Sequence, residues 1–172
     1  RTTFAVLTSI IALQISMIYT KRETATKREM IVFHTKSNSI ISQKNGGRIK
    51  VFSNDTLLLQ SPKATLISSY LSSDFSQLSA TVSIKNLLYF NGKKILVIDS
   101  SGVYKISSQP DIVLLIQSPK INLDRVLQEL HPKIIIADAS NSYSIQKIWK
   151  RSCRKKNIPF HATAEKGFYS LN

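Results

Sequence analysis

The chain has 172 residues, and 24 Lys and Arg against 10 Asp and Glu leave a formal net charge of +14. With 42% hydrophobic residues, five Gly and five Pro, the composition excludes a disordered or fibrous chain, and the length fits one domain with an appendage. A single cysteine excludes an internal disulfide framework and a cysteine-rich zinc module. The positive charge indicates a polyanionic partner, either nucleic acid or an acidic lipid surface.

An uncharged apolar segment at residues 3–20 predicts a transmembrane helix. As a helix, these 18 residues would extend about 27 Å, close to the hydrocarbon thickness of a bilayer. A secretory signal fits less well because no A-x-A-like cleavage site follows, and a buried core helix is the remaining alternative. The chain begins at Arg1 rather than at a methionine, so we expect this helix to be the last of several in a longer protein. We divide the chain into a transmembrane helix at residues 1–20, a juxtamembrane linker at residues 21–29 and a domain at residues 30–172.

The first part of the domain has the pattern of short strands, tight turns and one helix. We expect strands at residues 30–33, 39–42, 48–53, 87–90 and 93–98. Asn45-Gly46-Gly47 and Asn91-Gly92 are strong turn signals, and each joins two of these strands into a hairpin. Apolar residues at helical spacing within residues 61–73 predict a helix that begins at Pro62.

From residue 111 onward, strands and helices alternate, which predicts an α/β domain with parallel strands and right-handed crossovers. The strands are expected at residues 111–116, 133–137, 158–161 and 167–171. Asn122 caps the first helix, and Ser142 or Ser144 begins the second. Four residues of the second helix are expected on its inner side: Ile145, Ile148, Trp149 and Cys153. We therefore interpret Cys153 as a small buried hydrophobe rather than a nucleophile.

Candidate catalytic and metal-binding residues are few. His34, His131 and His161 are isolated in the sequence, so none forms a local metal-binding pair, and no glycine-rich phosphate loop is present. Asp99 and Asp138 each end an apolar strand, a position that lines the active edge of many α/β sheets. The serines and glycine after Asp99 favour the alternative that such carboxylates form turns or cap helices. We predict no catalytic residue, no metal site and no cofactor.

The densest positive charge lies at residues 147–156, where 6 of ten residues are basic and none is acidic. The six are Lys147, Lys150, Arg151, Arg154, Lys155 and Lys156. A helix that only faces solvent usually mixes charges through i,i+4 pairs, and this segment lacks them. Because phosphate binding would offset the repulsion between these like charges, we predict that the six residues bind DNA. A merely solubilising face and contact with lipid headgroups are the alternatives.

Two long runs carry a family resemblance. PDIVLLIQSPKINLDRVLQELHPKIIIADASNS at residues 110–142 and WKRSCRKKNIPFHATAEKGFYSL at residues 149–171 resemble the C-terminal end of ComEC-family competence proteins. Members are polytopic membrane proteins that internalise single-stranded DNA, and many end in a metallo-β-lactamase-like domain outside the membrane. Residues 30–53 resemble the opening strands of that domain. Residues 94–100 resemble a strand that ends in a metal-bridging aspartate, which would correspond to Asp99.

The metal-binding motifs of catalytic members are missing. Their H-x-H-x-D-H motif has no counterpart, since residues 55–86 contain no histidine. Gln117-Ser118-Pro119 stands where they carry His-His-Gly-Ser, and Asn141-Ser142-Tyr143-Ser144 replaces their late histidine-bearing loop. Asp99 alone cannot hold a two-metal centre. The resemblance therefore implies a degenerate metallo-β-lactamase-like domain without catalytic residues.

The expected function is that of a non-catalytic domain in a membrane protein for uptake of single-stranded DNA in natural transformation. The alternatives are a divalent-metal nuclease with an unrecognised ligand set and a purely structural domain of the channel. The expected partners are single-stranded DNA, the lipid bilayer through residues 3–20 and the remainder of the same membrane protein. The basic residues after the apolar segment favour the cytoplasmic side, whereas the resemblance implies the extracytoplasmic side, which we adopt.

Overall fold

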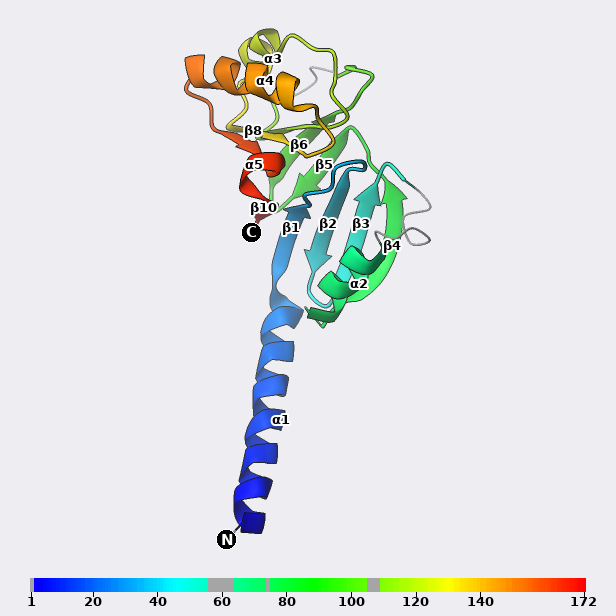
Figure 1. The fold of residues 1–172 in the computed structure, drawn as a ribbon, viewed down its shortest axis with the longest axis vertical. Coiled ribbons are helices and arrows are strands. Elements are labelled where there is room, and N and C mark those ends of the chain that lie inside the picture. The colour runs from blue at the N-terminus through cyan, green and yellow to red at the C-terminus, as the bar shows by residue number, and fades with distance from the viewer. Residues whose placement is uncertain (1, 56–63, 74, 105–108) are drawn as a thin grey trace.

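The computed structural model describes residues 2–55, 64–73, 75–104 and 109–172. Within these ranges a long helix, α1 (Thr2–Thr26), projects away from a domain built on two five-stranded sheets (Figure 1). The large apolar residues of α1 are exposed along its whole length, and none of the apolar window is buried in the domain. A core helix would be mostly buried, so that alternative is wrong. The helix is long and apolar enough to cross a membrane.

The first sheet has the order β10-β1-β2-β3-β4. Its strands are β1 (Arg28–Val32), β2 (Ile40–Asn45), β3 (Arg48–Ser53), β4 (Gln77–Ser83) and β10 (Tyr169–Leu171). Neighbouring strands are antiparallel except β3 and β4, which are parallel and are connected through α2 (Ala64–Ser73). Thus the last described strand, β10, pairs with β1, the strand that follows α1.

The second sheet has the order β5-β6-β7-β8-β9. Its strands are β5 (Leu87–Phe90), β6 (Lys93–Ile98), β7 (Ile112–Leu115), β8 (Ile134–Ala137) and β9 (Phe160–Ala162). A hairpin joins β5 to β6, and the strands from β6 to β9 are parallel. The helices α3 (Leu123–Leu130) and α4 (Tyr143–Lys155) connect β7 to β8 and β8 to β9, and α5 (Thr163–Lys166) follows β9. The predicted alternation of parallel strands and helices is confirmed.

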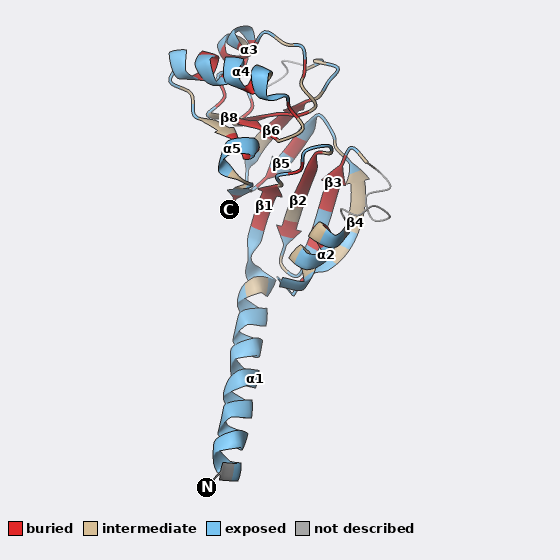
Figure 2. Cartoon of the chain, in the orientation of Figure 1, coloured by how far each residue is buried: buried red, intermediate tan, exposed pale blue. Residues whose placement is uncertain are grey.

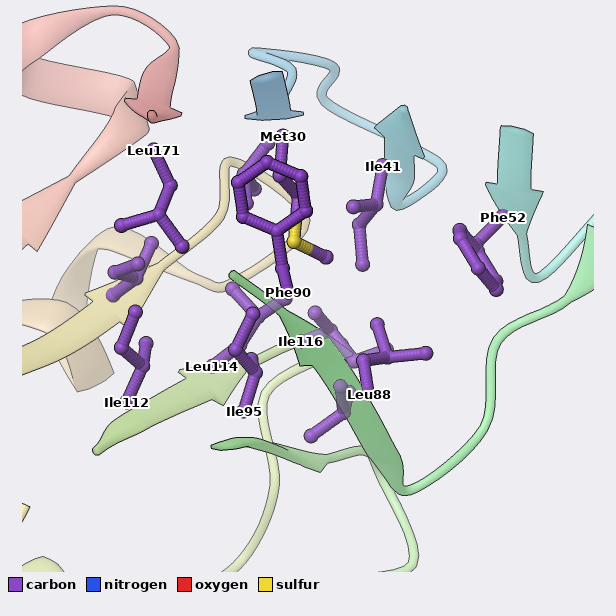
Figure 3. Packing of buried hydrophobic residues seen from close by; sticks show 13 residues of the cluster. Met30, Ile41, Phe52, Leu88, Phe90, Ile95, Ile112, Leu114, Ile116 and Leu171 are labelled. Carbon is purple, nitrogen blue, oxygen red and sulfur yellow. The ribbon is translucent and has the colours of Figure 1, made fainter. Parts of the chain in front are cut away.

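Three apolar clusters give the domain four layers: α2, the first sheet, the second sheet, and α3 with α4 (Figures 1 and 2). Between the sheets, Met30, Ile41 and Phe52 face Leu88 and Leu114 across the central cluster (Figure 3). Alternate residues of each strand point to opposite faces, so one strand can supply two clusters. The mixed α/β fold is therefore confirmed.

The hairpin between β2 and β3 packs against the end of α1. Gly46 lies in the left-handed region with φ of 63°, and its N–H donates to the carbonyl of Lys27 at 3.1 Å. A Cβ atom at Gly46 would lie 2.5 Å from the carbonyl oxygen of Ala25, whereas one at Gly47 would meet nothing within 4 Å. A side chain at Gly46 would therefore force the end of α1 away from the domain.

Several elements differ from the sequence-based expectation. Residues 21–29, expected to be a linker, continue α1 as helix to Thr26 and enter β1 at Arg28. The strand β4 and the short helix α5 were not expected: β4 has a weak Ser-rich and Thr-rich alternation, and α5 has only 4 residues. The helix expected from Pro62 is observed from Ala64, and its predicted start lies outside the described residues.

Candidate functional site: a basic helix and a polar cluster at the strand ends

A polar cluster occupies the carboxyl ends of β7 and β8, in the same sheet as β6, which Asp99 directly follows. Asp138 directly follows β8, is 1% exposed, and accepts hydrogen bonds from the backbone N–H and the hydroxyl of Ser140. The amide nitrogen of Asn141 donates to the carboxylate of Asp138 at 3.0 Å and to the carbonyl of Leu115 at 2.7 Å. The cluster thus ties the end of β8 to the end of β7.

The same cluster positions the start of α4. The N–H of Ser118 donates to the side-chain oxygen of Asn141 at 2.8 Å, and the N–H of Ser142 donates to the hydroxyl of Ser118 at 2.8 Å. Gln146 donates to the carbonyl of Asn141 at 2.7 Å from within the helix. The cluster also reaches the first sheet: the hydroxyl of Ser39, just before β2, lies 3.3 Å from the hydroxyl of Ser140. Sequence periodicity could not identify this network, because its members come from three loops.

The two strand-end aspartates have different environments. Burial raises the pKa of Asp138 to about 6, and hydrogen bonds from Ser140 oppose only part of that shift. Asp99 is partly exposed, and its carboxylate accepts from the N–H and hydroxyl of Ser101 at 3.0 and 2.6 Å. This is the predicted turn-forming role. The pocket beside Asp99 has a volume of about 90 Å³, well below the roughly 300 Å³ at which ligand pockets begin.

The histidines do not assemble into a site. His34 is exposed, and His131 is exposed in the left-handed conformation that ends α3. His161 lies within hydrogen-bond distance of the carbonyl of Gly167 at 3.1 Å and packs edge-on against Tyr169. In the part of the chain that the structure describes, no group of three or more His, Cys, Asp or Glu side chains could hold a metal ion.

The helix α4 is strongly amphipathic. Its inner side packs through Trp149 and Cys153, which are 3% and 0% exposed, against the second sheet and α3. Burial raises the pKa of Cys153 to about 12, so the thiol stays protonated, in line with its interpretation as a buried hydrophobe. The expected inner position of Ile148 is wrong, because this side chain is 59% exposed beside a groove between α3 and α4. Gln146 and Ser152 occupy the remaining inner positions.

All six predicted DNA-binding residues are exposed, and we call them together the basic face: Lys147, Lys150, Arg151, Arg154 and Lys155 on α4 and Lys156 at its C-cap. The ammonium of Lys147 lies 5.3 Å from the ring centre of Tyr143. Lys150 pairs with Glu165 of α5 at 2.5 Å, a partner that helical spacing could not reveal because it lies 15 positions away. No other carboxylate among the described residues forms an ion pair with the basic face.

The basic face is remote from α1. Along the longest axis of the molecule, α4 lies at one end and the start of α1 at the other, with both sheets between α4 and the end of α1 (Figure 1). A bilayer crossed by α1 would therefore have its nearest headgroups beside β1 and the β2–β3 hairpin rather than beside α4. This arrangement disfavours the lipid-headgroup alternative for the basic face.

Replacing Asp138 by Asn tests the cost of its buried charge. Because the pKa of the folded state lies above the usual value of 3.8, the folded state binds more protons between about pH 4 and 6. The Asp138 contribution to the free energy of unfolding thus falls as the pH rises through that window, by up to about 3 kcal/mol. Asp138→Asn should raise that free energy by about 1 to 3 kcal/mol at pH 7.5 and much less at pH 4, measured by urea unfolding.

Asp99→Asn is the control, since it removes a partly exposed carboxylate that also accepts from a nearby serine. A destabilised Asp138→Asn protein at pH 7.5 would contradict the prediction. It would show that the ionised carboxylate contributes favourably to the network.

Comparison with known families agrees with this architecture. The family model of the ComEC C-terminal domain matches residues 30–172, which is the whole chain after α1 and the first residues of β1. No curated protein matches the chain. Because the family model covers most of the chain, the protein belongs to the ComEC family of membrane proteins, whose C-terminal domain is associated with DNA uptake in competence.

Proposed function

We propose that this domain is a non-catalytic part of a membrane protein that imports single-stranded DNA in natural transformation, and that the basic face of α4 contacts the DNA. The observation that carries the proposal is the exposure of six cationic side chains on one packed helix and its C-cap, at the end of the domain far from α1 (Figure 1). A membrane-remote basic surface in a DNA-uptake protein fits a role in guiding the strand toward the membrane.

The packing of α4 supports binding to phosphates. Trp149 and Cys153 fix the helix against the sheet, and the polar cluster fixes its first turn, so the cations project from a rigid support. Only Lys150 has a carboxylate partner among the described residues, and that pair is half exposed, where ion pairs contribute little. DNA phosphates can therefore replace solvent counterions on the basic face with little rearrangement.

A fourfold substitution of Lys147, Lys150, Arg151 and Arg154 by alanine tests the DNA contact. Each lost phosphate contact reduces the salt slope of single-strand binding by about 0.7, so the slope should fall by up to about 3. The dissociation constant should rise about ten- to a hundredfold at moderate salt. Fluorescence anisotropy of a labelled single-stranded oligonucleotide, with the detergent-purified chain, measures both quantities.

The matched control removes the same charge from other surfaces by replacing four exposed residues: Lys36, Arg48, Lys85 and Lys93. This variant should bind within a few-fold of the unmodified chain. Unchanged affinity and salt slope in the α4 variant would favour a structural domain of the channel that does not touch DNA. Equal losses in both variants would mean that overall charge, rather than α4, determines binding.

We also propose that the domain is a degenerate relative of metallo-β-lactamase-like domains without nuclease activity. The carboxylate of Asp99 is engaged in a turn, the pocket beside it is small, and Gln117 and Ser118 stand where catalytic members carry histidines. Metal analysis of the purified chain after exposure to Zn²⁺ or Mn²⁺ should find less than one ion per molecule. Stoichiometric metal that disappears in Asp99→Ala would instead favour a nuclease with an unusual ligand set.

We place the domain on the extracytoplasmic side, where it would meet incoming DNA. Because the thiol of Cys153 is buried, we expect it to react little with a maleimide. A Ser144→Cys substitution adds a thiol on the exposed surface of α4, and its labelling reports on which side of the membrane the domain lies. A membrane-impermeant maleimide should label this variant in cells with an intact cytoplasmic membrane, whereas the unmodified chain should remain unlabelled. Labelling that requires permeabilisation would place the domain in the cytoplasm.

A further inference from the structure

A groove of about 540 Å³ lies where α1 meets the base of the domain, and the proposed DNA contact does not use it. Met17, Ile18 and Lys21 of α1 form one wall. Leu71 near the end of α2 and Phe75, just before β4, form the other. In Figure 1 the end of α2 lies next to the end of α1, at the side of the domain that faces the membrane.

The α1 wall changes from apolar to cationic along the helix. Met17 and Ile18 lie at the end of the uncharged segment, and Lys21 is the first charged residue after it. Met17 and Lys21 are four positions apart and therefore lie on the same face of the helix. In a spanning helix this places Met17 and Ile18 at the level of the acyl chains and Lys21 at the level of the headgroup phosphates.

Phe75 gives the opposite wall an aromatic ring outside the core of the domain. Its side chain is 49% exposed, and its φ of 48° lies in the left-handed region, which bulky residues rarely adopt. Hydrogen bonds around the turn hold this conformation: the N–H of Ser76 donates to the carbonyl of Leu71 at 3.0 Å. Exposed aromatic side chains at this level are typical of segments that bury an apolar face in the lipid interface.

The two walls have a fixed separation. The turn at Gly46 packs against the carbonyl of Ala25 and donates to that of Lys27, so the hairpin holds the end of α1 against the first sheet. The N–H of Gln77, the first residue of β4, donates to the carbonyl of Gly47 at 2.8 Å in the same hairpin. The groove is therefore part of the fold rather than a gap that closes when the helix tilts.

We propose that this groove binds one anionic phospholipid from the leaflet on the side of the domain, with an acyl chain along Met17, Ile18 and Phe75 and the phosphate beside Lys21. The groove begins on the membrane-spanning helix, so leaflet lipids can reach it directly. The lysine favours a headgroup with net negative charge over a zwitterionic one. This inference does not depend on DNA binding, since α4 lies at the other end of the molecule.

A tryptophan reporter at position 75 tests the proposal in the whole chain. The Phe75→Trp variant is placed in phosphatidylcholine vesicles that contain increasing amounts of dibrominated phosphatidylglycerol or dibrominated phosphatidylcholine. The natural Trp149 is buried in α4, far from the groove, and the unmodified chain gives its background signal. The emission of the reporter should be half-quenched at about a fivefold lower mole fraction of brominated phosphatidylglycerol than of brominated phosphatidylcholine.

Lys21→Gln in the reporter background should abolish the preference for phosphatidylglycerol. Arg22→Gln, which removes an exposed charge one position away that does not line the groove, should leave the preference within about twofold. Equal quenching by both lipids would overturn the proposal, because the groove would then only touch the bilayer. Absence of quenching would also overturn it and would indicate that another protein segment covers the groove.

Discussion

The apolar layer between the two sheets is the contact on which the other features depend. Each sheet presents one row of alternate side chains to this layer, with Phe52 and Leu114 on opposite sides (Figure 3). Burial of these rows fixes the register of the strands, since a shift by one residue would turn apolar side chains outward. Once the sheets are joined, their outer faces are free to bind α2 on one side and α3 and α4 on the other.

The layered arrangement also brings the polar ends of the parallel strands together at one edge of the second sheet. Carboxyl ends of parallel strands leave polar groups at one edge of a sheet, and something must satisfy them. Here Asn141 and Ser140 donate to one carboxylate oxygen of Asp138, and the backbone of Ser142 donates to Ser118. The other oxygen of Asp138 is buried without a hydrogen-bond partner among the described residues. Burial raises the pKa of the Asp138 carboxylate, and the hydrogen bonds that it accepts lower it only in part. The network also anchors the start of α4 to this edge of the sheet.

The sequence predicted the parts of the structure that depend on local pattern. The strands at residues 48–53 and 93–98 have the predicted bounds, and the cap at Asn122 accepts from the N–H of Arg125 as expected. Ile148 is exposed because it lies about 100° around the helix from its neighbour Trp149, and Trp149 and Cys153 face the core.

The contacts that the sequence did not reveal join distant residues. The pair of Lys150 with Glu165 and the network of Ser39, Ser118 and Asn141 depend on how loops meet in space. The groove at α1 likewise brings together segments more than fifty positions apart, such as Ile18 and Leu71. Hydropathy and periodicity do not predict such tertiary contacts, because each depends only on residues that are close together in the sequence.

The pairing of β10 with β1 has a consequence for synthesis of the protein. Residues 30–32, which follow α1 almost directly, pair with β2 on one side and with residues 169–171 on the other. The first sheet therefore remains incomplete while nearly the whole domain is being translated, although α1 has long since left the ribosome. During that interval the edge of β1 is open to pairing with other chains. The helix that is long and apolar enough to cross a membrane is therefore synthesised well before the sheet can close.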